Sequence, residues 1–189
     1  MTTTHEARGV APDVLKQLRE CDDAGHTRQP FTDPEGGAPL RCCLRHSEAG
    51  ERIVLVSYAP LRRWAAETGA EPGPYEECGP VFVHAQECAG QTSGPGYPAG
   101  LHGARRVLRA YSADGHILGG TLVEVPKERA GEVDDVLRDV FADPAVALVH
   151  VRAVEHGCFM VEIRRGRALH GPRPLRPPPG PPSTAACGG

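Results

Sequence analysis

The stretch VLRAYSADGHILGGTLV, residues 107–123, contains two apolar runs rich in β-branched residues on either side of a reversal. Residues 107–111 and 117–123 favour strands. The Asp114-Gly115 step between them favours a tight turn, because glycine adopts a positive φ angle at little cost. The stretch therefore predicts an antiparallel hairpin, around which the other elements are arranged.

A helix and a second hairpin are predicted after this stretch. Pro126 suits the first turn of a helix, and apolar residues then recur with helical spacing at Val133, Val136, Leu137, Val140 and Phe141. The helix should end before Asp143-Pro144, because the residue preceding proline is pushed out of the α region. Residues 146–154 and 158–164 predict two more strands, which reverse around Glu155-His156-Gly157.

The elements predicted before the hairpin are a short helix and two strands. Residues 11–21 show helical spacing, and residues 53–58 form a β-branched run typical of a central strand. A helical turn should follow Pro60, and residues 81–84 predict a second short strand. The Gly- and Pro-rich segments 22–39 and 89–103 predict long loops.

This order of elements favours antiparallel connections over regular βαβ units. It predicts an α+β fold, with a single compact domain containing a mixed or mainly antiparallel sheet and a few helices. We divide the chain into an N-terminal helix and connection (1–29), a globular domain (30–166) and a disordered Pro/Gly-rich tail (167–189). Cys187 in that tail has no expected function.

Composition and charge exclude several classes of function. A net charge of -3 gives no reason to expect nucleic acid as a partner. The chain starts without a secretory pattern, and no segment approaches the ~20 apolar residues of a membrane span, so we expect a cytoplasmic protein without a membrane partner. Seven cysteines in such a protein are expected to be core residues, metal ligands or reactive thiols. An edge strand offers a surface for a homodimer.

Familiar cofactor and nucleophile motifs are missing from the sequence. There is no Gly-x-Gly-x-x-Gly run between a strand and a helix and no Walker-type loop, so nicotinamide, flavin and nucleoside triphosphate sites of the common kinds are not expected. There is also no Gly-x-Ser-x-Gly elbow. The cofactor is left open, with a divalent metal ion as the candidate.

The segment GPVFVHAQEC, residues 79–88, is the strongest candidate for chemistry. His84 and Cys88 are good ligands for a borderline-soft ion such as Zn(II). In a continuous strand their Cα atoms would be ~13 Å apart, so a shared ion requires the chain to turn at Ala85-Gln86. Further ligands must come from elsewhere, and the available donors are Cys42, Cys43, His150 and Cys158.

Thiol chemistry without a metal is the alternative for the same residues. Cys43 lies between Arg41 and Arg45 in the sequence, and Cys88 lies near His84, so either cysteine can be a thiolate. In this reading His84 is a general base and Cys88 a nucleophile. The opposing interpretation is that the cysteines are buried core residues.

The terminal hairpin adds His150 and Cys158 to the catalytic candidates. If Val154 pairs with Cys158, the side chains of His150, Arg152 and Cys158 share a face; if it pairs with Gly157, Cys158 turns to the other face. The sequence leaves this register open.

Arginine and tyrosine residues supply candidates for substrate binding. Tyr75, Arg109, Tyr111 and Arg152 are predicted to line a polar pocket, in which guanidinium groups hold a carboxylate or phosphate. The alternative is that they form surface charge and aromatic packing. Arg41 is added as a further substrate-binding candidate.

Four motifs resemble the bacterial family called domain of unknown function 1203: PLRCCL at 39–44, EAGER at 48–52, GPVFVHA at 79–85, and HVR at 150–152 with GCF at 157–159. The resemblance covers about residues 30–165. It implies a compact bacterial domain and supplies no catalytic residues.

Two functions follow as expectations. The first is an enzyme that acts on a small molecule through a His/Cys site, either metal-assisted or thiol-based. The alternative is a non-catalytic small-molecule or protein-binding domain in which the cysteines are structural. The enzyme requires His84, Cys88 and a distant polar residue to converge, whereas dispersed cysteines would favour the binding domain.

Overall fold

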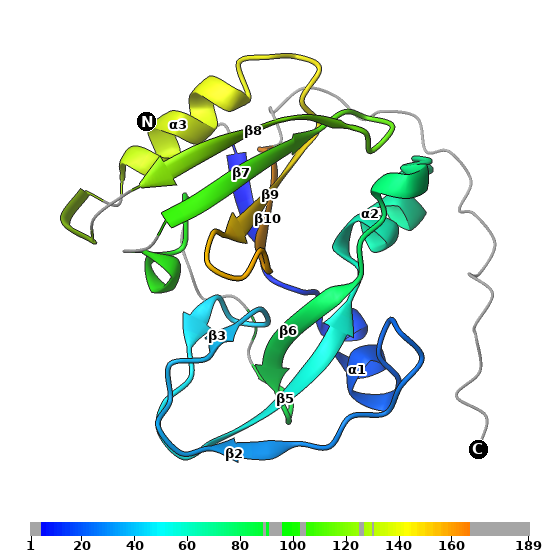
Figure 1. The fold of residues 1–189 in the computed structure, drawn as a ribbon, viewed down its shortest axis with the longest axis vertical. Helices are drawn as coiled ribbons and strands as arrows, with labels where there is room; N and C mark the ends of the chain where they lie inside the picture. The colour runs from blue at the N-terminus through cyan, green and yellow to red at the C-terminus, as the bar shows by residue number, and fades with distance from the viewer. Residues whose placement is uncertain are drawn as a thin grey trace.

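The computed structural model describes residues 5–88, 90, 96–102, 105–124, 127–129 and 131–166 (Figure 1). Pro126, Cys187, part of the loop predicted at 89–103 (89, 91–95 and 103) and the whole tail predicted at 167–189 lie outside these residues. Within them the chain forms three α-helices and two five-stranded sheets, which confirms the α+β class. The strands divide between two sheets where the sequence suggested one.

The first sheet contains both predicted hairpins. Its strand order is β1-β10-β9-β7-β8, and every neighbouring pair is antiparallel. The strands are β1 (His5–Arg8), β7 (Arg105–Tyr111), β8 (Ile117–Glu124), β9 (Leu148–Ala153) and β10 (Phe159–Arg165). The β7–β8 hairpin is the one predicted from residues 107–123, with a register shift between Ala110 and Tyr111.

Helix α3 (Glu132–Val140) covers one face of the first sheet (Figure 1). Its buried Val133 and Leu137 belong to the same hydrophobic cluster as Leu108, Val149 and Val161 of the sheet. Because side chains alternate along a strand, the opposite face carries the residues in between, among them Arg109, His150 and Arg152. This second face is the polar one.

The second sheet has the order β2-β5-β6-β3-β4. Its strands are β2 (Phe31–Asp33), β3 (Pro39–Leu40), β4 (Arg45–His46), β5 (Glu51–Tyr58) and β6 (Gly79–His84). Strand β5, predicted to be central, is an inner strand between β2 and β6, and β3 pairs with β6 in the parallel direction, so this sheet is mixed. Helix α1 (Pro12–Glu20) buries Leu15 and Leu18 in the hydrophobic cluster of this sheet.

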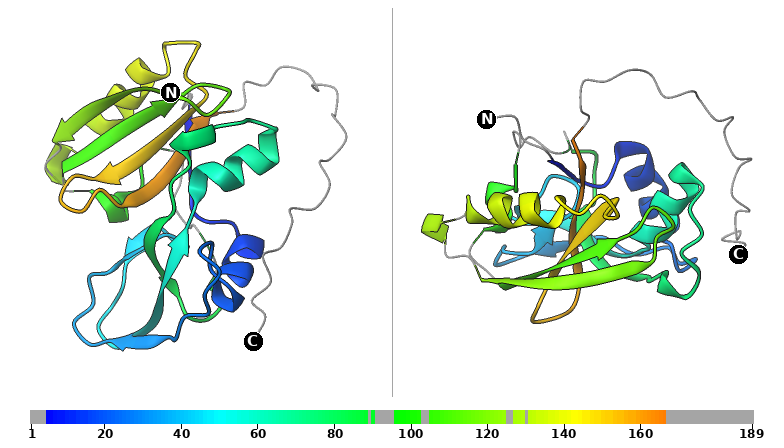
Figure 2. Two further views of the ribbon diagram at one scale, coloured as in Figure 1. Left: turned by 45° about the vertical axis from the view of Figure 1, so that its right-hand side comes forward. Right: turned by 90° about the horizontal axis from the view of Figure 1, so that it is seen from above.

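Helix α2 (Pro60–Thr68) and Phe159 connect the two halves of the molecule. Leu61 and Trp64 of the helix share a buried cluster with Tyr111 and Leu148 of the first sheet. Phe159 begins a strand of the first sheet but packs in the core of the second. Figure 2 shows the sheets as two layers turned relative to each other, with α2 beside their junction.

The segment predicted as a long loop at 22–39 is anchored by a buried carboxylate. Asp22 accepts hydrogen bonds from the backbone N–H of Ala24, His26 and Ser57 and from the Arg28 guanidinium at 2.7 Å. Burial opposes ionisation of Asp22, but these donors outweigh it and hold the pKa of the carboxyl well below its ordinary value. These hydrogen bonds hold the start of the segment in place, where the sequence offers few buried apolar side chains.

We predict that Asp22→Asn lowers the free energy of unfolding at pH 7 by about 2–3 kcal/mol, because an amide cannot accept all of these bonds. The folded-state pKa is depressed, so the carboxylate stabilises the protein above pH ~4, and this contribution is lost as the pH falls. The gap between variant and wild type should therefore narrow in acid. Urea unfolding at pH 7 and pH 3 measures it. The exposed Asp114→Asn is the control, and equal stability of the two variants at pH 7 would contradict the prediction.

Candidate functional site

The adjacent cysteines lie in the turn that joins β3 to β4, residues 41–44. Because β3 runs parallel to β6, with Leu40 beside Phe82, this turn reaches the end of β6 where His84 lies. The turn closes through a hydrogen bond from Leu44 N–H to the Leu40 carbonyl at 2.9 Å. Leu44 has a φ angle of 58°, which is unfavourable for a branched residue, and its burial in the core of the first sheet offsets this strain.

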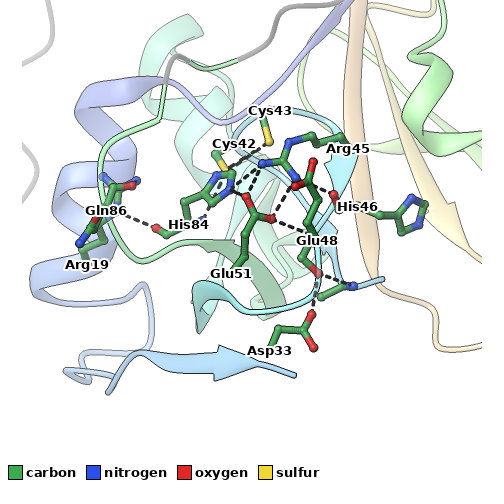
Figure 3. A network of polar contacts seen from close by, with 12 residues as sticks. Arg19, Asp33, Cys42, Cys43, Arg45, His46, Glu48, Glu51, His84 and Gln86 are labelled. Atoms are coloured by element: carbon green, nitrogen blue, oxygen red, sulfur yellow. Dashed lines mark hydrogen bonds and ion pairs between the residues drawn. The ribbon is translucent and has the colours of Figure 1, made fainter. Parts of the chain in front are cut away.

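The turn brings two sulfur atoms to the imidazole of His84 (Figure 3). Cys42 Sγ lies 3.3 Å from His84 Nδ1. Cys43 Sγ lies 3.9 Å from the same nitrogen and 3.9 Å from Cys42 Sγ. The donor atoms of Cys42, His84 and Cys88 all lie within 4.8 Å of one another. Cys42 and Cys43 therefore lie close to His84, which was predicted to share a site with Cys88.

The chain bends directly after β6, at Ala85 and Gln86, as a shared ion requires. Arg19 of α1 holds the bend: its Nε donates to the His84 carbonyl at 2.9 Å and its Nη2 to the Gln86 carbonyl at 2.7 Å. Two carbonyl oxygens bound to one guanidinium fix the direction in which the chain leaves the strand. This direction returns Cys88 toward His84.

Glu51 and Arg45 occupy the other side of the imidazole (Figure 3). His84 Nε2 lies 3.2 Å from Glu51 Oε1, and Arg45 pairs with both oxygens of the same carboxylate. The hydrogen bonds from Arg45 lower the pKa of Glu51 to about 2. Arg45 Nη2 lies 3.2 Å from the same Nε2, so an ionised carboxylate and a guanidinium both hold this side of the ring, and Nδ1 faces the sulfur atoms.

The two adjacent thiols differ in acidity. Cys42 is buried and its S–H points to Cys43, and this hydrogen bond together with burial raises the pKa of Cys42. The same hydrogen bond lowers the pKa of Cys43 to about 6, with help from the backbone N–H of Arg45. The surroundings therefore favour ionisation of the more exposed cysteine over that of the buried one.

These separations fit a tetrahedral metal centre. With Zn–S bonds of ~2.3 Å and Zn–N bonds of ~2.0 Å, tetrahedral ligands are separated by about 3.8 Å for two sulfurs and about 3.5 Å for a sulfur and a nitrogen. The sulfur–sulfur and sulfur–nitrogen distances of 3.3–3.9 Å among Cys42, Cys43 and His84 match this geometry. The donor set of thiolates and imidazole suits Zn(II) and other borderline or soft ions.

His150 and Cys158 do not join this cluster. They line a separate pocket of about 370 Å³ together with Tyr75 and Arg152. Gly79 and Pro80 at the start of β6 also line it, whereas His84 lies five residues further along, or ~16 Å away in a strand. The four residues predicted as catalytic thus divide between two sites at opposite ends of β6.

The register of the terminal hairpin follows the second of the two alternatives. Ala153 N–H donates to the Cys158 carbonyl at 2.9 Å and Phe159 pairs with Arg152, so Val154 lies opposite Gly157. A register shift follows between Phe159 and Val161. Cys158 precedes the strand and reaches the pocket from the turn.

His150 is the most buried polar residue of the pocket, with 1% of its surface exposed. Its Nε2 lies 3.6 Å from Glu162 Oε2, beyond hydrogen-bond distance, and has no other partner among the described residues. Burial lowers the pKa of His150, so the ring is neutral at pH 7. The rings of Tyr111 and Phe159 pack edge-on against it.

Arg41, predicted to bind substrate, lies instead in the interior with 3% of its surface exposed. Its Nε donates to the Phe159 carbonyl at 2.8 Å, and its other nitrogens reach the Pro39 carbonyl and Met160 Sδ. Burial lowers its pKa to about 10, which still leaves it charged at neutral pH. Among the described residues Arg41 therefore holds the turn 41–44 against β10, and the pocket lining does not include it.

The fold and the two sites define an α+β protein with a thiol–imidazole cluster and a separate polar pocket. The chain belongs to the family described as protein of unknown function (DUF1203), whose model matches residues 37–165. The matched range contains Cys42, His84 and Cys88 as well as the residues of the pocket. Neither the curated proteins nor the solved structures include a significant match. Among the described residues, no helix has the length and apolar character needed to cross a membrane.

We predict that Arg41→Met lowers the free energy of unfolding by about 3 kcal/mol, because it removes the donor from buried acceptors. Chemical denaturation measures this loss. Arg105→Met is the matched control, since Arg105 is exposed and its salt bridge among the described residues is with Glu124 at the surface; its effect should stay within about 0.5 kcal/mol. If the two variants are equally stable, Arg41 does not hold the turn.

Proposed function

We propose that the protein binds one Zn(II)-class ion through Cys42, His84 and Cys88, with Cys43 as the fourth donor. The convergence of these donors, within 4.8 Å for the first three, carries the proposal. They come from the turn 41–44, from the end of β6 and from the bend after it. Segments this far apart in the chain are not expected to gather thiols and an imidazole unless the fold specifies it.

The hydrogen bonding of His84 supports the same proposal. Histidines that bind a metal generally direct the other ring nitrogen to a carboxylate or a carbonyl. His84 directs Nδ1 to the sulfurs and Nε2 to Glu51, which Arg45 keeps ionised. This arrangement orients the ring so that Nδ1 faces the sulfurs, as ligation by Nδ1 requires.

Whether the ion can catalyse a reaction depends on whether Cys43 is a permanent or a replaceable ligand. Cys42 is buried, whereas Cys43 and Cys88 are both half-buried; because the 4.8 Å group consists of Cys42, His84 and Cys88, we assign the exchangeable fourth position to Cys43. A Zn(II)-class ion with a replaceable fourth ligand supplies Lewis-acid chemistry to a small-molecule substrate. If Cys43 is a permanent ligand, the site is closed and structural, as in the alternative of a non-catalytic binding domain.

We predict about one equivalent of Zn(II) per chain in tag-free protein, and less than about a tenth of that in Cys42→Ser and His84→Ala. Elemental analysis by mass spectrometry measures this. Cys158→Ser is the control, because this thiol lies in the separate pocket, and it should keep the full equivalent. Retained metal in Cys43→Ser would support the open, catalytic site, and lost metal the closed one.

A metal-free wild type after growth and purification with added zinc would contradict the proposal. One fast-reacting thiol in that protein, absent from Cys43→Ser, would then support the thiol-based alternative. Uniformly slow thiols would support structural cysteines.

We further predict that Glu51→Gln weakens zinc binding about 10–100-fold, because the amide no longer accepts a charge-assisted bond from Nε2. Competition with a chromophoric chelator measures the affinity. The exposed Glu35→Gln tests whether loss of one surface charge explains the effect, and it should bind zinc as the wild type does. Equal affinities of the two variants would remove Glu51 from the metal site.

The expected cytoplasmic location, bacterial origin and homodimer stay predictions. A reducing compartment suits the proposal, because thiols must stay reduced to bind an ion. Cys42, Cys43 and Cys88 are all free thiols here.

A further inference from the structure

The pocket at the start of β6 is a second site with its own chemistry. Its volume of about 370 Å³ is that of a small-molecule site. Aromatic side chains form much of the wall, namely Tyr58, Tyr75, Tyr111 and Phe159. Flat apolar walls of this kind favour a flat apolar body.

One guanidinium group lines this pocket, and a second lies on the same face of the sheet. Arg152 lines it, and Arg109 lies on the same face of the first sheet, because Arg109 pairs with His150 and Arg152 with Val107 on the neighbouring strands. Both side chains are largely covered, with 26% of Arg109 and 16% of Arg152 exposed. Two covered cations on one rigid sheet face need an anion.

Glu77 supplies that anion from outside the sheet. Its Oε1 accepts from Arg109 at 2.9 Å and its Oε2 lies 2.6 Å from Arg152, so a single carboxylate bridges both guanidinium groups. The residue belongs to the irregular segment 76–78 before β6, and 45% of its side chain is exposed. The cations are therefore fixed, whereas the carboxylate comes from a surface segment and is exposed to solvent.

We infer that this pocket binds a small aromatic carboxylate, whose carboxylate group replaces that of Glu77 on Arg109 and Arg152. The bridging geometry of Glu77 shows that the arginines accept a planar, two-oxygen anion. The aromatic walls provide the surface for the ring. The buried His150, whose Nε2 has no hydrogen-bond partner among the described residues, gives the pocket a further polar group. The inference does not depend on the metal site, which lies at the other end of β6.

Benzoate is the probe, with uncharged benzamide of nearly the same shape as its control. We expect saturation-transfer NMR and shift titration on the full-length chain to show benzoate binding at least about 10-fold more tightly than benzamide. Arg152→Gln should weaken benzoate at least about 10-fold. Glu77→Gln should tighten it about 3- to 10-fold, because the competing charge is removed while the side chain keeps its size. The exposed Arg105→Gln is the control for loss of a positive charge and should bind as the wild type does.

The expected increase in benzoate affinity of Glu77→Gln tests the inference even if Arg152→Gln fails to fold. If the ion pair of Glu77 were only structural, breaking it would not increase that affinity. An unchanged or weaker affinity in Glu77→Gln would overturn the inference, as would equal binding of benzamide. Tighter binding of phenyl phosphate than of benzoate would overturn the assignment to carboxylates. Benzoate binding with these variant effects in protein stripped of metal would confirm that the pocket acts by itself.

Discussion

The buried guanidinium of Arg41 is the interaction on which the arrangement of this molecule depends. It donates to the carbonyl of Phe159, where the first sheet meets the core of the second. The backbone of the same residue donates to Phe82 of β6 and accepts from Val10 before α1. A cation removed from water must have its donors satisfied, so the chains around it are not free to move apart. The turn that carries Cys42 and Cys43 is thereby fixed against both sheets.

Strand β6 then determines the positions of the two candidate sites. Its first residues line the pocket, and its last residue, His84, receives the sulfurs of the turn. The parallel pairing of β3 with β6 is what directs the turn to the His84 end, since an antiparallel pairing would carry it toward the pocket. The short parallel pairing of β3 with β6 thus places the thiol–imidazole site at one end of β6 and leaves the arginine–aromatic pocket at the other end.

Elements that depend on local pattern could be predicted from the sequence, whereas the sheet partition and the contacts that support the site could not. The β7–β8 hairpin, α3 and the inner strand β5 are specified by alternation, helical spacing and a turn dipeptide. Strands β1 and β2 were missed because three or four mostly polar residues carry no periodic signal. The bend at residues 85–86 is required for a shared ion, whereas Cys42 and Cys43 were only two of four available donors, and the sequence could not separate them from His150 and Cys158. Glu51 was missed because its role follows from cross-strand pairing.

The two carboxylates that face arginines illustrate how local bonding separates a fixed group from a replaceable one. Glu51 bridges Arg45 and His84, accepts a backbone bond from Glu48 N–H at 2.8 Å, and has 24% of its side chain exposed. Glu77 is 45% exposed, and among the described residues only guanidinium groups bond to it. A carboxylate with neutral donors as well as a cation loses several bonds at once if it leaves, whereas one held only by cations can exchange with another anion that satisfies the same charges. The same pair of residue types therefore builds a rigid support at one end of β6 and an exchangeable contact at the other.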